Sequence, residues 1–103
     1  MNCKNIGNYK HLYWSIKSSL LGEEFPKLID IAFEWRDNHI VIYFYHDGKL
    51  SDDDTEKYSD VTGEVISHYD SPVMIGENFL EWASSKPLPT REHWFFSGIQ
   101  YKL

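Results

Sequence analysis

Cysteine is almost absent from this chain of 103 residues, in which Cys3 is the only one. A single thiol cannot form a disulfide within the chain or supply the cysteine ligands of a structural zinc site. Long apolar runs are missing too. No stretch approaches the roughly 18 apolar residues of a membrane-spanning helix, and residues 1–10 lack the apolar core of a signal peptide. We therefore expect no membrane interaction and a reducing compartment, which predicts a cytoplasmic location.

Basic residues are also scarce, since ten lysines and arginines stand against sixteen acidic residues. The pI is near 5.2. Because phosphate backbones bind basic surfaces, direct binding of nucleic acid is not expected. Hydrophobic residues make up 42% of the chain and aromatic residues 17%, which is enough for a hydrophobic core. The length fits a single domain over residues 1–103.

The excess negative charge is concentrated in one quarter of the chain. Between His46 and Asp70 there are eight acidic residues and two lysines, whereas the rest of the chain carries eight charges of each sign. This segment therefore accounts for the whole net charge of −6.

Hydrophobic periodicity predicts six secondary-structure elements, in the order α-β-β-α-β-β. We predict helices over 8–21 and 51–69, and strands over 28–36, 39–46, 73–82 and 93–101. The third strand is expected to be irregular around Gly76 and Asn78. The last strand has aromatic residues on both faces, so we expect it to be central or covered on both sides. Residues 83–92, with two prolines, are predicted to form a loop.

This order predicts an α+β fold with a four-stranded, mostly antiparallel sheet and two helices packed on one face. Gly22 is placed to end the first helix, Asp37-Asn38 to form a hairpin turn, and Ser51 to cap the second helix. On the strand over 28–36, Asp30 and its alternate neighbours are expected on the outer face. The outward aromatic face of the next strand needs cover or a partner.

The second helix is predicted to carry a row of carboxylates on its solvent face. Asp53, Glu56, Asp60 and Glu64 follow one another at steps of three, four and four, which places them on one side of a helix. A charged stripe is often only the solvated face of an amphipathic helix, but such a face usually mixes signs, because like charges at i, i+4 are destabilising. We favour a binding surface for a basic protein and keep the solvated face as the alternative.

Catalytic chemistry has weaker support. His46-Asp47 and His68-Tyr69-Asp70 are the two places where an acid–base pair is conceivable. Both lie at predicted element ends, where these residue types are common. The five histidines show no metal-ligand spacing, so neither a metal nor another cofactor is expected. A small enzyme with a His/Asp pair is a second hypothesis, and a homodimer that hides the aromatic strand face is a third.

Several short motifs occur in an order that resembles a known family. The motifs are Ser19-Leu20-Leu21-Gly22, Pro26, Phe44-Tyr45-His46-Asp47-Gly48, Ser51-Asp52, Glu56, Glu64-Val65-Ile66 and Pro87-Leu88-Pro89. The order resembles small bacterial immunity proteins encoded beside toxins of contact-dependent growth inhibition and related polymorphic toxin systems. The resemblance implies a protein without catalytic residues that neutralises its cognate toxin, commonly a nuclease, by tight binding. It carries over no contact residues, because these differ among members.

Charge and resemblance together predict a surface that binds a basic toxin domain. A nuclease fits this expectation, because its cleft must hold phosphates. The four carboxylates of the row are the predicted centre, with Asp47, Asp52 and Asp54 beside them. Tyr43 or Tyr45 is predicted to supply an apolar anchor.

Overall fold

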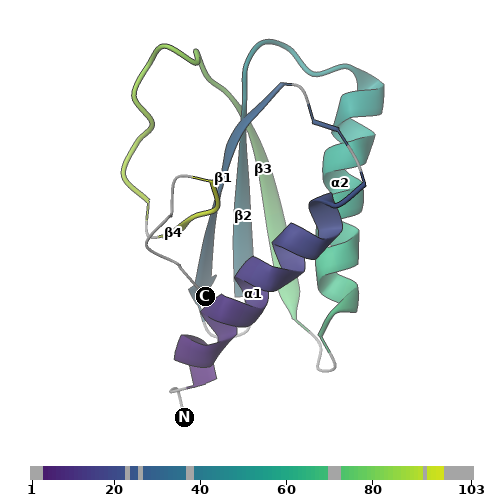
Figure 1. The fold of residues 1–103 in the computed structure, drawn as a ribbon, viewed down its shortest axis with the longest axis vertical. Helices are drawn as coiled ribbons and strands as arrows, with labels where there is room; N and C mark the ends of the chain where they lie inside the picture. The colour runs from purple at the N-terminus through teal and green to yellow at the C-terminus, as the bar shows by residue number, and fades with distance from the viewer. Residues whose placement is uncertain are drawn as a thin grey trace.

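The computed structural model describes residues 4–22, 24–25, 27–36, 39–69, 73–91 and 93–96, with the side chains of 4–8 and 36 excepted. The elements are α1 (Lys4–Leu20), β1 (Leu28–Arg36), β2 (His39–His46), α2 (Asp52–Ser67), β3 (Met74–Glu81) and β4 (His93–Trp94). The predicted order is confirmed. In Figure 1, α1 crosses in front of the sheet and α2 runs beside β3. Over the described part of the chain, no helix is both long and apolar enough to cross a membrane.

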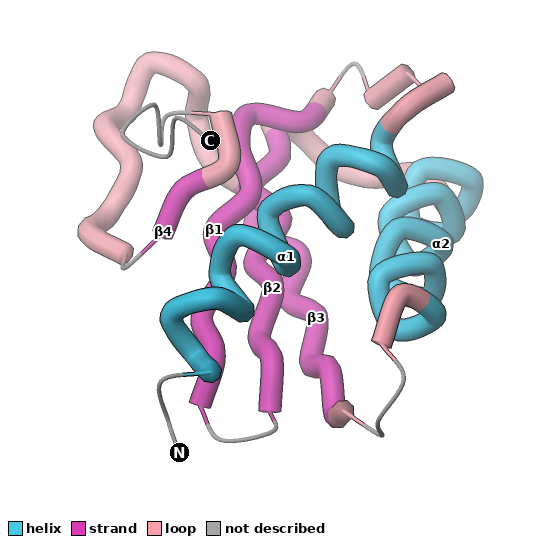
Figure 2. The backbone as a smooth tube through the Cα atoms, turned by 60° about the horizontal axis from the view of Figure 1, so that its bottom comes forward, coloured by secondary structure: helices cyan, strands magenta, loops and turns pink. Residues whose placement is uncertain are grey.

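The four strands form one mixed sheet in the order β3-β2-β1-β4 (Figure 2). β1 pairs antiparallel with both β2 and β4, so the predicted α+β fold with a mostly antiparallel sheet is confirmed. β2 and β3 are parallel, which requires a crossover connection, and α2 supplies it. Their register continues without a shift from His39 opposite Met74 to His46 opposite Glu81. The irregularity expected around Gly76 and Asn78 was therefore wrong.

Local sequence signals determine where the helices begin and end. Gly22 follows α1 with a φ of 81°, a backbone conformation that glycine adopts without steric cost. The Ser51 hydroxyl accepts a hydrogen bond from the Asp54 amide at 3.1 Å, and the Ser51 amide donates to Asp54 Oδ2 at 3.2 Å. This reciprocal pair is a capping box, so the predicted cap is confirmed. The helix then continues unbroken through Gly63.

The hydrophobic core lies between the sheet and the two helices. Alternate side chains of β1 (Ile31, Phe33 and Trp35) and of β2 (Ile40, Ile42 and Phe44) form one buried cluster with residues of α1 and α2. The aromatic rings of Phe44 and Tyr58 stack with their centroids 5.1 Å apart. The buried members of the cluster are Leu12, Ile16, Ile31, Phe33, Trp35, Ile40, Ile42, Phe44, Tyr58, Val61, Val65 and Phe95.

Residues 82–91 and 93–94 cover the aromatic side chains of β2 on the opposite face of the sheet. Trp82 and Trp94 contact the ring of Tyr45 at centroid distances of 5.4 and 5.3 Å. Asp30 and Ala32 are 1% and 0% exposed, so the expectation that this side of β1 faces solvent was wrong. The cover that the aromatic face needs comes from the same chain.

β4 is shorter than predicted and lies at the edge of the sheet, so a central position for it was wrong. After two paired residues the chain bends, and Phe95 N–H and Phe96 N–H donate to Ile31 O and Asp30 Oδ1 at 2.7 and 2.8 Å. The remainder of the predicted strand, 97–101, and the hairpin turn over 37–38 lie outside the described residues.

Candidate functional site

The predicted carboxylate row lies on the exposed side of α2. Asp53, Glu56, Asp60 and Glu64 are all exposed, while the opposite side of the helix enters the core. Within the described residues, no lysine, arginine or histidine forms an ion pair with any of the four. Lys57 lies beside the row, but its Nζ donates to the Glu24 carbonyl oxygen at 3.1 Å. The row is therefore a set of four exposed carboxylates that form no ion pair with a described cation.

The acidic residues at the start of α2 differ in their surroundings. Asp52 is exposed, whereas Asp54 is half-buried and forms an ion pair with Lys27 at 3.1 Å. The hydrogen bond from the Ser51 amide and the contact with Lys27 hold the pKa of Asp54 below its usual value of 3.8. Lys27 Nζ also donates to the Lys49 carbonyl oxygen at 2.8 Å. The ion pair with Lys27 therefore links the start of α2 to the segment before β1. Lys27 also partly neutralises the charge of Asp54.

Two further carboxylates extend the acidic surface beyond α2. Glu77 on β3 is exposed and accepts a hydrogen bond from the Ser59 hydroxyl at 3.0 Å. Glu81, at the end of the same strand, lines a hollow of about 400 Å³ together with Asp47 and Trp82. Sequence analysis missed both glutamates, because only the parallel pairing of β3 with β2 brings them beside α2 and Asp47.

The two tyrosines predicted as apolar anchors are engaged within the chain. Tyr45 is 1% exposed, and its hydroxyl accepts a hydrogen bond from Arg91 Nε at 2.9 Å. The guanidinium of Arg91 lies 3.8 Å from the centroid of the Tyr43 ring, and Tyr43 remains half-exposed. Burial alone would lower the pKa of Arg91, but the hydrogen bond to Tyr45 and the nearby Tyr43 and Glu34 raise it. Tyr45 therefore offers no surface to a partner, whereas one edge of Tyr43 is accessible.

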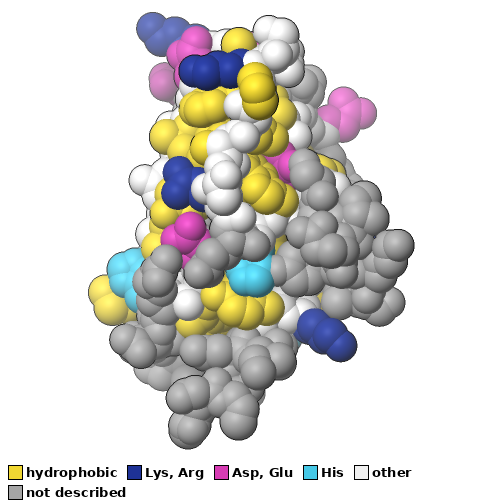
Figure 3. Space-filling model, turned by 90° about the vertical axis from the view of Figure 1, so that its left-hand side faces the viewer, with side chains coloured by type: hydrophobic (Ala, Val, Ile, Leu, Met, Phe, Trp, Pro, Cys, Tyr) yellow, Lys and Arg dark blue, Asp and Glu magenta, His cyan; other side chains and the backbone are white. Residues whose placement is uncertain are grey.

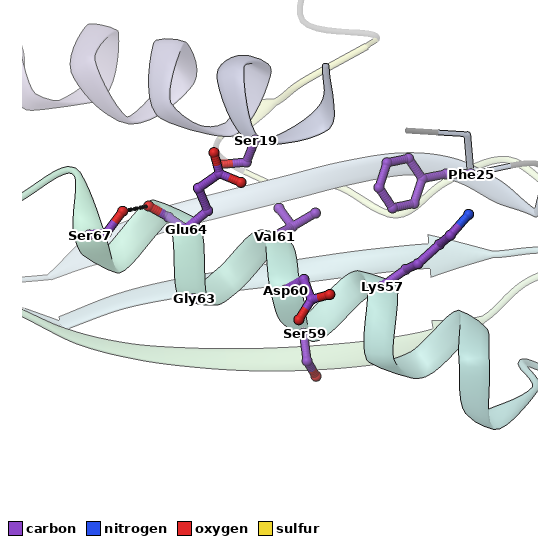
Figure 4. Close-up of a pocket in the computed structure, with 9 residues that line it drawn as sticks. All are labelled: Ser19, Phe25, Lys57, Ser59, Asp60, Val61, Gly63, Glu64 and Ser67. Carbon is purple, nitrogen blue, oxygen red and sulfur yellow. Dashed lines mark hydrogen bonds between the residues drawn. The ribbon is translucent and has the colours of Figure 1, made fainter. Parts of the chain in front are cut away.

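A groove of about 590 Å³ separates the end of α1 from α2 (Figure 4). Val61 and Phe25 provide apolar lining, and Ser19 contributes a hydroxyl from α1. Asp60 and Glu64 of the carboxylate row also line it, and the side chain of Glu64 reaches toward Ser19. No sequence signal could have found this groove, since it depends on how the two helices pack together.

The histidines proposed for acid–base chemistry contact no carboxylate among the described residues. Nδ1 of His46 is 2.7 Å from the Gly48 carbonyl oxygen, and the imidazole is buried. Nδ1 of His68 is 2.5 Å from the hydroxyl of Ser15. Asp70, the other half of the second pair, lies outside the described residues. Among the described residues, no three histidine, cysteine or acidic side chains lie close enough together to hold a metal ion.

The side of the molecule that is on the left of Figure 1 has a different character. Figure 3 shows hydrophobic side chains along the middle of this face, with acidic and basic groups interspersed among them. The aromatic residues of β2, which suggested a homodimer, contact Trp82, Arg91 and Trp94 of the same chain. The coloured part of this face therefore carries charges of both signs, whereas the exposed row on α2 consists of carboxylates.

Burial of Tyr58 beneath α2 gives a testable pH dependence. Its side chain is 2% exposed, and its hydroxyl has no hydrogen-bond partner in the described structure. Burial, with a smaller effect from Asp54, raises its pKa from 10.0 to about 12. As the pH rises, Tyr58 therefore loses its proton in the unfolded chain before it does so in the folded protein. This difference lowers the free energy of unfolding between pH 10 and about 12.

We expect Tyr58→Phe to abolish this loss, which amounts to about 2–3 kcal/mol when complete. At pH 7 the variant should be as stable as the natural protein, or more stable by about 1 kcal/mol, because no hydrogen bond is lost. Urea unfolding at pH 7 and pH 11 measures the change, and at pH 11, midway between the two pKa values, about half of the complete loss is expected. Tyr69→Phe is a parallel test, since burial raises the pKa of Tyr69 as well. Equal alkaline losses in the Tyr58→Phe variant and the natural protein would contradict the assignment.

Fold and surface together define a small α+β protein that presents an acidic helix. The family model described as MafI2 immunity protein matches residues 9–97, and the chain belongs to this family. A search of the curated proteins found no match. Membership confirms the resemblance to small immunity proteins of polymorphic toxin systems. It implies a role in toxin immunity, with a cognate toxin as partner and a binding rather than an enzymatic role.

Proposed function

We propose that this immunity protein binds a basic nuclease domain of its cognate toxin through the acidic face of α2. The observation that carries the proposal is the exposed row of Asp53, Glu56, Asp60 and Glu64, which form no ion pair with a described cation. A nuclease must hold phosphates, so its active cleft is basic. An acidic helix is complementary to such a cleft and competes with the nucleic acid for it.

The placement of the row favours rapid capture of the toxin. Opposite potentials accelerate association, and an immunity protein must reach its toxin before the substrate does. Asp47, Asp52, Glu77 and Glu81 extend the negative potential around the row. The accessible edge of Tyr43 belongs to another face of the sheet, so the acidic face acts without it. We place this interaction in the cytoplasm, where the nucleic-acid substrates are.

Binding to the toxin domain encoded by the adjacent gene tests the proposal. We expect a 1:1 complex whose association rate falls at least about tenfold between 50 and 300 mM salt, because salt screens the steering field. Stopped-flow fluorescence of the chain's tryptophans can follow association. A nuclease assay with and without the chain reports neutralisation. A complex whose association rate is insensitive to salt would contradict the acidic mechanism, and the absence of any complex would contradict the proposed function.

A further inference from the structure

The groove between α1 and α2 has the chemistry of a receptor for a long cationic side chain. Its apolar surface is formed by Val61, which is 2% exposed, and by the half-buried ring of Phe25. Asp60 and Glu64 stand at its margin, one helical turn apart. Lysine and arginine combine an apolar stem with a charged end, so they match such a lining.

The charges of the groove lack a counter-ion from the described chain. Lys57 also lines the groove, but its Nζ donates to the Glu24 carbonyl oxygen and lies 5.9 Å from the centroid of the Phe25 ring, at the opposite end of the groove from Glu64 (Figure 4). The Ser19 hydroxyl donates to the Ser15 carbonyl oxygen at 2.8 Å, which leaves the Ser19 oxygen able to accept. A cation that entered the groove at the end away from Lys57 would meet the Glu64 carboxylate and the Ser19 oxygen, with Asp60 one helical turn along the margin.

Building on the proposed function, we infer that the groove receives a lysine or arginine side chain of the toxin. The aliphatic stem lies against Phe25 and Val61, and the charged end lies between Asp60 and Glu64. This contact gives two of the four row carboxylates a different role in binding from that of the other two. Asp53 and Glu56 act through their field, whereas Asp60 and Glu64 hold the toxin directly and slow its dissociation.

Two double variants with the same loss of charge test the inference. The groove pair is Asp60→Asn with Glu64→Gln, and the control pair is Asp53→Asn with Glu56→Gln. Both pairs should slow association with the toxin domain to a similar extent. We expect the groove pair to accelerate dissociation about 100-fold, and the control pair by less than about threefold. All four side chains are exposed, so both variants should fold, and circular dichroism and thermal unfolding check this.

The possible results separate the inference from the function on which it rests. Equal dissociation rates for the two pairs would overturn the groove contact and leave the toxin-binding role intact. If the natural chain forms no complex with the toxin domain, the proposed function fails and the inference fails with it. Where the groove pair dissociates fast, substituting each lysine and arginine of the toxin by alanine identifies the inserted residue. That residue should show no further loss when combined with the groove pair.

Discussion

Replacing both Glu56 and Asp60 by lysine is expected to weaken binding of the toxin domain by about 100- to 1,000-fold, or roughly 3–4 kcal/mol. The double reversal puts two positive charges in the middle of the row, where they would face the basic partner. Like charges brought together at an interface cost several kcal/mol. Isothermal titration calorimetry at constant salt measures the loss.

The fold should tolerate this change. Both side chains are exposed, and the new lysine at position 60 would stand one turn before Glu64, a spacing that slightly stabilises a helix when the charges are opposite. The control is the charge-preserving exchange Glu56→Asp with Asp60→Glu, which should bind within a few-fold of the natural chain. Unchanged affinity after the double reversal would remove the acidic helix from the binding mechanism.

The second large effect concerns stability and arises from Asp30, whose side chain is 1% exposed. Its Oδ1 accepts hydrogen bonds from the backbone N–H groups of Ile31 and Phe96, both at 2.8 Å. The pairing of β1 with β2 is irregular between Leu28 and Asp30, and the chain bends after β4. One carboxylate oxygen of Asp30 therefore accepts hydrogen bonds from two backbone N–H groups, at places where the regular backbone hydrogen bonding between strands is interrupted.

Asp30→Ala is expected to lower the free energy of unfolding by about 3–5 kcal/mol, because buried N–H groups would lose their acceptor. Asp30→Asn is the control, since its side-chain oxygen occupies the same place and should cost less than half as much. Guanidinium unfolding followed by circular dichroism gives both values. An alanine variant as stable as the asparagine variant would show that the two hydrogen bonds contribute little.

The parts of the fold that sequence predicted are those that local chemistry determines. The capping box of Ser51 and Asp54 fixes the start of α2 through residues three apart in the chain. The alternation of residue types along β1 and β2 predicted where these strands begin and end and which side chains point inward, because this pattern also depends only on near neighbours in the chain. The row on α2 was predictable because helical spacing alone decides which side chains share a side.

The parts that sequence missed depend on contacts between distant segments. The alternation along β1 predicts that its outer face is exposed to solvent, yet Asp30 and Ala32 are buried there. Trp94 of β4 pairs with Ala32, and the Phe96 amide donates to Asp30 Oδ1. The aromatic run beginning at His93 is typical of a central strand, but pairing stops after two residues. Likewise, only tertiary packing creates the groove and places the glutamates of β3 near the acidic residues of α2 and Asp47.

The parallel crossover has a consequence for the order in which α2, the helix that we propose to bind the toxin, becomes packed during synthesis. The ring of Tyr58 on α2 packs against Phe79 of β3 at 5.8 Å, and Ser59 donates to Glu77 of the same strand. These supports lie about twenty residues later in the chain than the helix that they hold. A nascent polypeptide therefore lacks the packing that holds this acidic face until β3 has left the ribosome, and we expect a product truncated before that strand to bind no toxin.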